Sequence, residues 1–138
     1  MTSDPATLAR IRREIIESGR DRRYTADAYE FVLSGLAFYF AKLGEKRHVT
    51  GQELSKGLAE CAMVRFGPFA KRLLCHWGIS STNDFGFIVY NLIDIELMSR
   101  QESDKVKDFF GVFDLGEYLD HQDYYSVNKE RVRQIRGA

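Results

Sequence analysis

Single glycines divide this chain into segments whose apolar residues recur every three or four positions. The segments end at or next to Gly19, Gly44, Gly67 and Gly78. This spacing is that of an amphipathic helix, and glycine commonly follows a helix's last turn. The pattern predicts five helices, over residues 4–18, 25–43, 50–66, 68–77 and 81–97. The expected fold is therefore mainly α, a compact bundle of about five helices.

The clearest local signal is the sequence Thr50-Gly51-Gln52-Glu53, which has the form of a capping box. In a capping box the threonine hydroxyl and the glutamate carboxylate each accept a backbone N–H at the start of the helix. A second start is predicted at Thr25, with Tyr24 and Tyr29 at the positions of a hydrophobic staple. The helix that follows is apolar around most of its circumference, which is typical of a central helix.

The helical spacing of apolar residues ends after residue 97. Residues 98–100 and 106–112 favour two short strands joined by a turn, so a C-terminal β-hairpin is expected. A last helical turn is predicted to end near Leu119. Two helices followed by a hairpin have the order of a winged helix-turn-helix, and residues 68–112 are similar to it at the level of fold.

The length of 138 residues predicts one helical domain over residues 1–120, followed by a basic, mobile tail over 121–138. No apolar run approaches the roughly 20 residues of a membrane span. Cys61 and Cys75 are too few for a secreted disulfide scaffold. We therefore expect a cytoplasmic protein that does not enter the membrane.

Charge is unevenly distributed, although the formal net charge is zero. Residues 81–126 contain three basic and ten acidic residues, together with more aromatic residues than a small core needs. Aromatic residues on a surface mark protein interfaces. The leading hypothesis is an interaction protein that docks a protein partner, or a second copy of itself, through an acidic, aromatic face. The predicted contact residues are Asp104, Asp108, Phe109, Phe110, Phe113, Asp114 and Tyr118.

A nucleic-acid-associated regulator is the first alternative. Phosphate contacts need Lys or Arg, but the expected recognition helix, residues 82–97, contains neither. If nucleic acid binds, the basic ends of the chain are expected to bind it. The predicted contacts are Arg20, Arg22, Arg23, Lys129, Arg131, Arg133 and Arg136.

A small-anion site at the loop before residue 50 is the second alternative. Arg47 and His48 stand beside a helix N-terminus, whose free N–H groups favour anions. The competing interpretation is that Thr50 and Glu53 already occupy those N–H groups, and that Arg47 pairs with an acidic neighbour.

Catalytic and metal-binding patterns are not found in the sequence. The histidines and cysteines lack the spacing of zinc ligands, and no glycine-rich phosphate loop is present. Cys61 is expected in the core, and Cys75 on an exposed helix face. We therefore predict a protein that is not an enzyme and that uses no cofactor and no metal.

Several short stretches of sequence occur in a characteristic order along the chain. They are residues 47–54 (RHVTGQEL), 66–68 (FGP), 77–79 (WGI), 84–86 (DFG) with 88–89 (IV), and 108–109 (DF). Over roughly residues 24–119 this order resembles a family of short, uncharacterised bacterial proteins. The resemblance implies a bacterial cytoplasmic protein, and it implies no activity, cofactor or catalytic residue.

Overall fold

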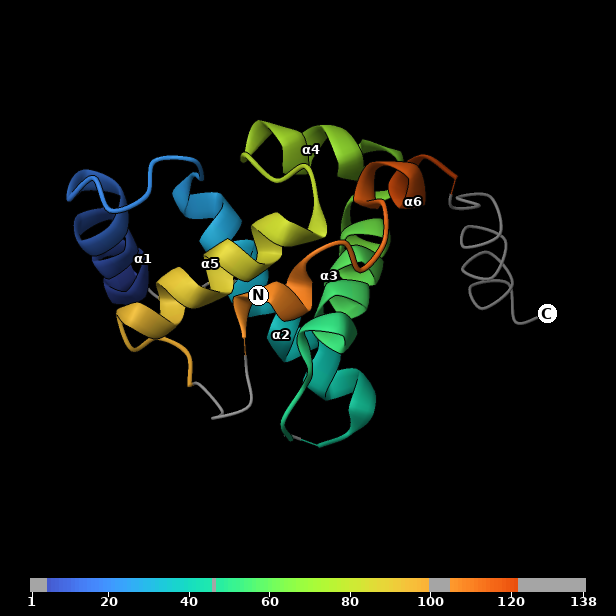
Figure 1. The fold of residues 1–138 in the computed structure, drawn as a ribbon, viewed down its shortest axis with the longest axis horizontal. Helices are drawn as coiled ribbons and strands as arrows, with labels where there is room; N and C mark the ends of the chain where they lie inside the picture. Colours follow the sequence, from blue (N-terminus) through green and yellow to red (C-terminus); the bar gives the residue numbers. More distant parts are fainter. Residues whose placement is uncertain (1–4, 46, 100–104, 122–138) are drawn as a thin grey trace.

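The computed structural model describes residues 5–45, 47–99 and 105–121, which form a bundle of helices with no β-strand among them (Figure 1). The α-helices are α1 (Pro5–Ile11), α2 (Ala26–Leu43), α3 (Gly51–Phe66), α4 (Ala70–His76), α5 (Thr82–Asp94) and α6 (Leu115–His121). A π-helical turn, η1 (Arg12–Glu17), extends α1, and two 3₁₀ turns, η2 (Gly67–Phe69) and η3 (Val106–Phe109), precede α4 and α6. The predicted mainly helical bundle is confirmed.

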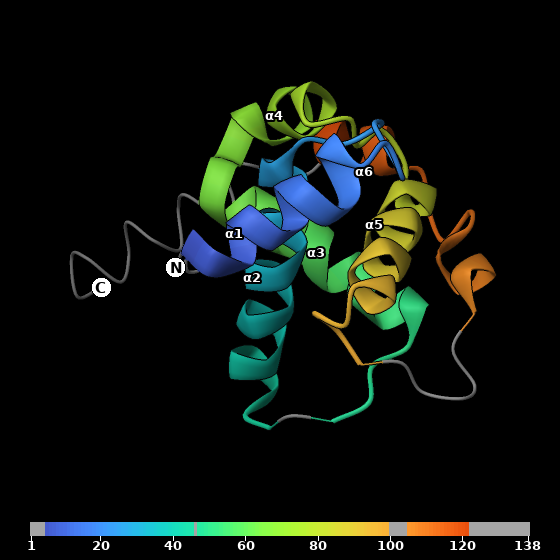
Figure 2. The same cartoon turned by 90° about the vertical axis from the view of Figure 1, so that its left-hand side faces the viewer.

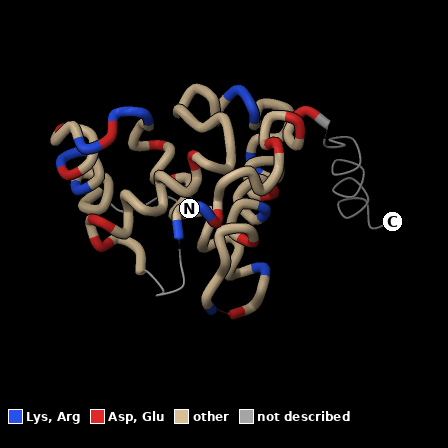
Figure 3. Tube along the Cα trace, in the orientation of Figure 1, with Lys and Arg blue, Asp and Glu red and all other residues tan. Residues whose placement is uncertain are grey.

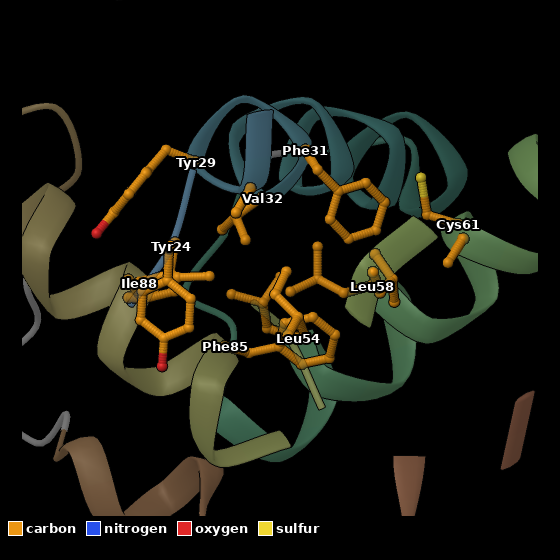
Figure 4. Packing of buried hydrophobic residues seen from close by; sticks show 14 of the residues in the cluster. Tyr24, Tyr29, Phe31, Val32, Leu54, Leu58, Cys61, Phe85 and Ile88 are labelled. Atoms are coloured by element: carbon orange, nitrogen blue, oxygen red, sulfur yellow. The ribbon is translucent and has the colours of Figure 1, made fainter. Parts of the chain in front are cut away.

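The core lies where α2, α3 and α5 meet. Val32 from α2, Leu58 from α3, and Phe85 and Ile88 from α5 are completely buried, and Figure 4 shows them gathered between the three helices. Burying one such side chain contributes roughly 1.5–3 kcal/mol. These three helices therefore form the frame on which the shorter elements pack.

The N-terminal element covers one side of this frame. Ile11 and Ile15 are completely buried, one on α1 and one on η1, and they attach the element through the predicted apolar stripe. The Arg10 guanidinium also donates a hydrogen bond to the carbonyl of Ile95, just beyond α5. Figure 2 shows α1 crossing in front of α2 when the molecule is seen from this side.

A buried polar network fixes the link between η1 and α2. Asp21 is only 8% exposed, and its carboxylate accepts two hydrogen bonds from the Arg23 guanidinium, at 3.0 and 2.8 Å. The Asn91 amide of α5 donates to the same carboxylate at 2.8 Å and to the Tyr29 hydroxyl at 3.1 Å. Burial alone would raise the pKa of Asp21, but the hydrogen bonds from Arg23 and Asn91 hold that pKa below its ordinary value.

The predicted C-terminal hairpin is wrong for the residues that can be described. Val106–Phe109 forms a 3₁₀ turn where the second strand was expected, and its predicted turn, residues 101–105, lies mostly outside the described residues. The turn is helical because the Asp108 carboxylate accepts the Lys105 backbone N–H at 3.2 Å. The described residues between 98 and 112 therefore form no strand and give no support to the winged-helix interpretation of residues 68–112.

Candidate ligand-binding pocket

The loop before α3 is held in place by the capping box that the sequence predicts. The Thr50 hydroxyl accepts the Glu53 N–H at 3.1 Å, and the Glu53 carboxylate accepts the Thr50 N–H at 3.4 Å. The Arg47 guanidinium donates to Glu53 at 2.8 Å, and the Tyr39 hydroxyl donates to it at 3.2 Å. The backbone N–H groups of Thr50 and Glu53, which a small anion would need at this helix end, therefore already form hydrogen bonds within the chain.

The Glu53 carboxylate accepts most of the hydrogen bonds described for this loop, and they change its pKa. The hydrogen bond from Arg47, assisted by Thr50 and Tyr39, outweighs burial and lowers the pKa of Glu53 to about 2. The unfolded chain has a pKa near the ordinary glutamate value of about 4.3. A carboxylate with a lowered folded pKa stabilises the fold above the unfolded pKa, and this contribution is lost as pH falls through the folded pKa.

We expect Glu53→Gln to lower the free energy of unfolding at neutral pH, because glutamine keeps the shape but not the charge. Between about pH 4.5 and pH 2 the wild type should lose stability more steeply than the variant, so the two should converge in acid. Urea unfolding at several pH values measures this. Parallel curves over that range would show that the Glu53 carboxylate does not contribute in this way.

The turn η3 packs directly onto the start of α3 and onto α5. A Cβ atom built on Gly51 would lie 2.9 Å from the backbone carbon of Asp108, and one on Gly86 would lie 2.8 Å from the Cβ of Phe109. Both distances are shorter than a real Cβ tolerates, so glycine is required at both close approaches. Phe109 is 5% exposed in the resulting groove. Segment 105–109 is thereby brought beside the loop at Arg47 and His48.

A pocket of about 560 Å³ opens between these segments, and we call it the α2–α5 pocket. Its apolar wall includes Leu33, Leu36, Phe40, Val89, Ile93 and Leu97. Arg47, His48 and Lys105 are exposed and lie at the solvent edge of the pocket, and Asp108 lies beside them. Ligand pockets in proteins commonly measure about 300–1,000 Å³ and combine an apolar lining with a few polar groups. The α2–α5 pocket has both properties.

Two sites that the sequence predicts separately meet in this pocket. Arg47 and His48 come from the predicted anion site, and Asp108 and Phe109 from the predicted partner face. Thr50 and Glu53 form the capping box that holds the start of α3, next to the pocket.

The rest of the predicted partner face does not form one exposed surface. Asp104 lies outside the described residues. Phe113 and Tyr118 pack on each other with tilted rings, 5.2 Å between centroids, and both are half-buried. Asp114 caps α6 by accepting the Glu117 N–H at 3.0 Å. Phe110, 42% exposed, is therefore the only large exposed aromatic residue of this face among the described residues.

The arginines predicted to contact nucleic acid are partly engaged within the protein. Arg20 pairs with Asp94 at 3.1 Å, and Arg23 pairs with Asp21. Figure 3 shows basic and acidic positions mixed along α1 and the link that follows it. Arg22 is exposed, whereas Lys129, Arg131, Arg133 and Arg136 lie outside the described residues. Nucleic-acid binding through the basic ends therefore stays a prediction.

The apolar wall of the pocket is the part of the site that the sequence did not reveal. Leu33, Leu36 and Ile93 follow the apolar spacing that predicts the buried face of a helix, yet each is only partly buried. One signal was present: α2 carries more apolar residues than one buried face can use. A helix with such a surplus contributes a second apolar face, and here that face lines the pocket.

Both cysteines are free thiols; Cys61 is buried and Cys75 is exposed, as expected. Burial raises the pKa of the Cys61 thiol, which disfavours its reactive thiolate form. No three His, Cys, Asp or Glu side chains gather closely enough to hold a metal ion in the part of the chain that is described.

Comparison with known proteins gives no family assignment: no family model, curated protein or solved structure matches this chain. The resemblance to a family of short bacterial proteins therefore stays a prediction. None of the described helices is both long enough and apolar enough to cross a membrane.

Proposed function

We propose that this protein is a binding protein whose α2–α5 pocket takes an apolar molecule with an anionic head group. The observation that carries the proposal is one cavity of about 560 Å³ with apolar walls and cationic side chains at its edge. Apolar walls favour a hydrocarbon or aromatic body, because each buried CH₂ group contributes about 0.8 kcal/mol.

The edge of the pocket favours a negative head group. Lys105 forms no ion pair with another described residue, whereas Arg47, which also lines the pocket, pairs with Glu53 at 2.8 Å and with Glu45 at 3.9 Å. The Asp108 carboxylate already accepts the Lys105 backbone N–H. The anionic head group would lie at the cationic edge, with its apolar body against α2 and α5.

A series of probes with similar hydrocarbon chains tests both parts of the proposal. Octanoate, octanol and octyltrimethylammonium carry unbranched chains of nearly the same length and differ in head-group charge. We expect octanoate to bind about tenfold more tightly than octyltrimethylammonium, because attraction of one head and repulsion of the other each amount to about 0.5–1 kcal/mol. Isothermal titration calorimetry measures the affinities. Equal affinities for all three would contradict the anionic preference.

Two variants locate the binding. Leu36→Trp fills the pocket and should abolish octanoate binding, whereas Leu43→Trp, at an exposed position near the end of α2, should not. Lys105→Gln should reduce the preference for octanoate over octanol. Unchanged binding in Leu36→Trp would place the ligand elsewhere and reject this site.

Docking of a protein partner is the second candidate, and the exposure of Phe110 favours it. The Phe110 ring is 42% exposed and packs on Phe87 at 5.5 Å between centroids. Exposed aromatic residues are common anchors of protein interfaces. Phe110→Ser should weaken the capture of a partner at least tenfold in a nuclease-treated pull-down, where a hot-spot residue contributes about 2 kcal/mol. Undiminished capture would exclude Phe110 as the anchor.

A further inference from the structure

A second, smaller pocket lies at the other end of α2, where that helix meets the end of α3 and the end of α4. Its volume is about 190 Å³, and we call it the aromatic pocket. Three aromatic residues, Phe31, Phe66 and Trp77, line it together with Asp27, Glu30 and Arg65. None of these residues lines the α2–α5 pocket, so the inference drawn here does not rest on the proposed function.

The three rings form one continuous aromatic surface. Their centroids are 5.7–5.9 Å apart, and Phe66 meets Trp77 edge to face. Phe31 is 2% exposed and leaves α2 toward α3 (Figure 4), so it forms the floor. Phe66 and Trp77 are half-buried and line the opening. The faces of such rings carry negative electrostatic potential and attract cations.

A cation of the protein already uses part of this surface. The Arg65 guanidinium lies 5.1 Å from the centroid of the Phe66 ring and donates a hydrogen bond to the Ser34 hydroxyl at 2.9 Å. The aromatic surface thus accepts a guanidinium in the geometry of a cation–π contact.

Two carboxylates stand on the same side of α2, at the edge of the pocket. Asp27 and Glu30 are three residues apart, a spacing that places side chains on one helix face. Within the described residues neither carboxylate forms a hydrogen bond or an ion pair, and Arg65 donates to Ser34 instead. Two carboxylates therefore face one guanidinium, which leaves the aromatic pocket with a net negative charge.

We propose that the aromatic pocket binds a cationic head group, a guanidinium or an alkylammonium, between the Phe31, Phe66 and Trp77 rings and the carboxylates of Asp27 and Glu30. The volume of 190 Å³ is below the range of about 300–1,000 Å³ that accommodates drug-sized molecules. It suits one head group, presented either by a free small cation or by a basic side chain of a partner protein.

Trp77 provides the measurement, because it is the only tryptophan of the chain and it lines the pocket. Its fluorescence is recorded while agmatine or tetramethylammonium is added at constant ionic strength, with tert-butanol as the uncharged control. Constant ionic strength removes changes that arise from charge screening alone. We expect a saturable change with both cations, with dissociation constants of roughly millimolar size, and no saturable change with tert-butanol.

Substitutions at the edge of the pocket assign the effect to this site. Glu30→Gln should weaken agmatine binding roughly threefold to tenfold, and Arg65→Gln should strengthen it roughly threefold by removing the competing cation. Glu45→Gln is the matched control, because Glu45 is an exposed carboxylate beyond the far end of α2 and should leave the affinity unchanged. Arg65 and Glu45 are exposed and Glu30 is partly exposed, so the variants are expected to fold.

The source of the head group is resolved by the peptide acetyl-Gly-Arg-Gly-amide. Saturation by the peptide at concentrations similar to those of agmatine supports binding of a partner's basic side chain, and saturation by agmatine alone supports a free cation. The proposal is overturned if neither agmatine nor tetramethylammonium gives a saturable change. It is also overturned if Glu30→Gln and Glu45→Gln affect binding equally.

Discussion

Replacing Gly78 with alanine should lower the free energy of unfolding by about 3 kcal/mol or more. Gly78 has a φ of +98°, in the left-handed region, and a Cβ built on it would lie 2.1 Å from the carbonyl oxygen of Arg23. The Arg23 oxygen is a backbone atom, so it can move only if the segment between η1 and α2 moves. That segment is held here by a hydrogen bond from the Thr25 N–H to the Trp77 carbonyl, at 3.2 Å. Urea denaturation of the variant measures the loss.

Gly44→Ala separates backbone strain from the steric contact. Gly44 has a similar φ of +80°, but no atom lies within 4 Å of the position of its Cβ. Its substitution should cost only about 1 kcal/mol, the ordinary penalty for alanine in this backbone conformation. Equal losses of unfolding free energy in Gly78→Ala and Gly44→Ala would show that the backbone at Arg23 moves to accommodate the added methyl group.

The Gly78 position illustrates how far the sequence predicts this fold. Its place after an apolar stripe correctly predicted the end of a helix, because that requirement is local. Its contact with Arg23 was not predictable, since the two residues are brought together only by tertiary packing. The predicted bundle is correct for the same reason: apolar periodicity and caps depend on residues within a few positions of one another.

The C-terminal region shows the opposite case. Residues 106–112 have a strand-like composition, yet Phe109 enters a groove that exists only because Gly86 on α5 and Gly51 on α3 allow close approach. The Asp108 carboxylate then holds a 3₁₀ turn. Local propensity was overridden by contacts distant in the sequence, which a single sequence does not display.

Both pockets follow from the excess of apolar residues on α2. Val32 faces the core, Leu36 faces the α2–α5 pocket, and Phe31 forms the floor of the aromatic pocket. The sequence predicted a central helix and identified Arg47 and His48, but apolar spacing alone does not distinguish residues that face the core from residues that line a pocket. The two edges differ in charge, with exposed cations at one and unpaired carboxylates at the other. One helix therefore supports two sites that would select ligands of opposite charge.

Replacing Asp84 with alanine should destabilise the protein by about 3 kcal/mol. One Asp84 oxygen accepts the backbone N–H groups of Ser80 and Ser81, at 2.9 and 3.0 Å, and so caps α5. The other accepts the hydroxyl of Tyr24, which is 3% exposed. A lost cap costs about 1 kcal/mol and a buried hydroxyl without an acceptor about 1–3 kcal/mol. Thermal or urea unfolding measures the change, and Asp84→Asn, which keeps one oxygen, should lose less.

A double-mutant cycle with Tyr24→Phe tests the cause of this loss. Tyr24→Phe alone should cost about 1 kcal/mol, but in the Asp84→Ala protein it should cost little or restore stability, because the unpaired hydroxyl is removed. The coupling free energy should therefore be about 1–2 kcal/mol. Additive losses would mean that water replaces Asp84 at the Tyr24 hydroxyl. In that case the link would be held to α5 by the Asp21–Asn91 hydrogen bond rather than by Asp84.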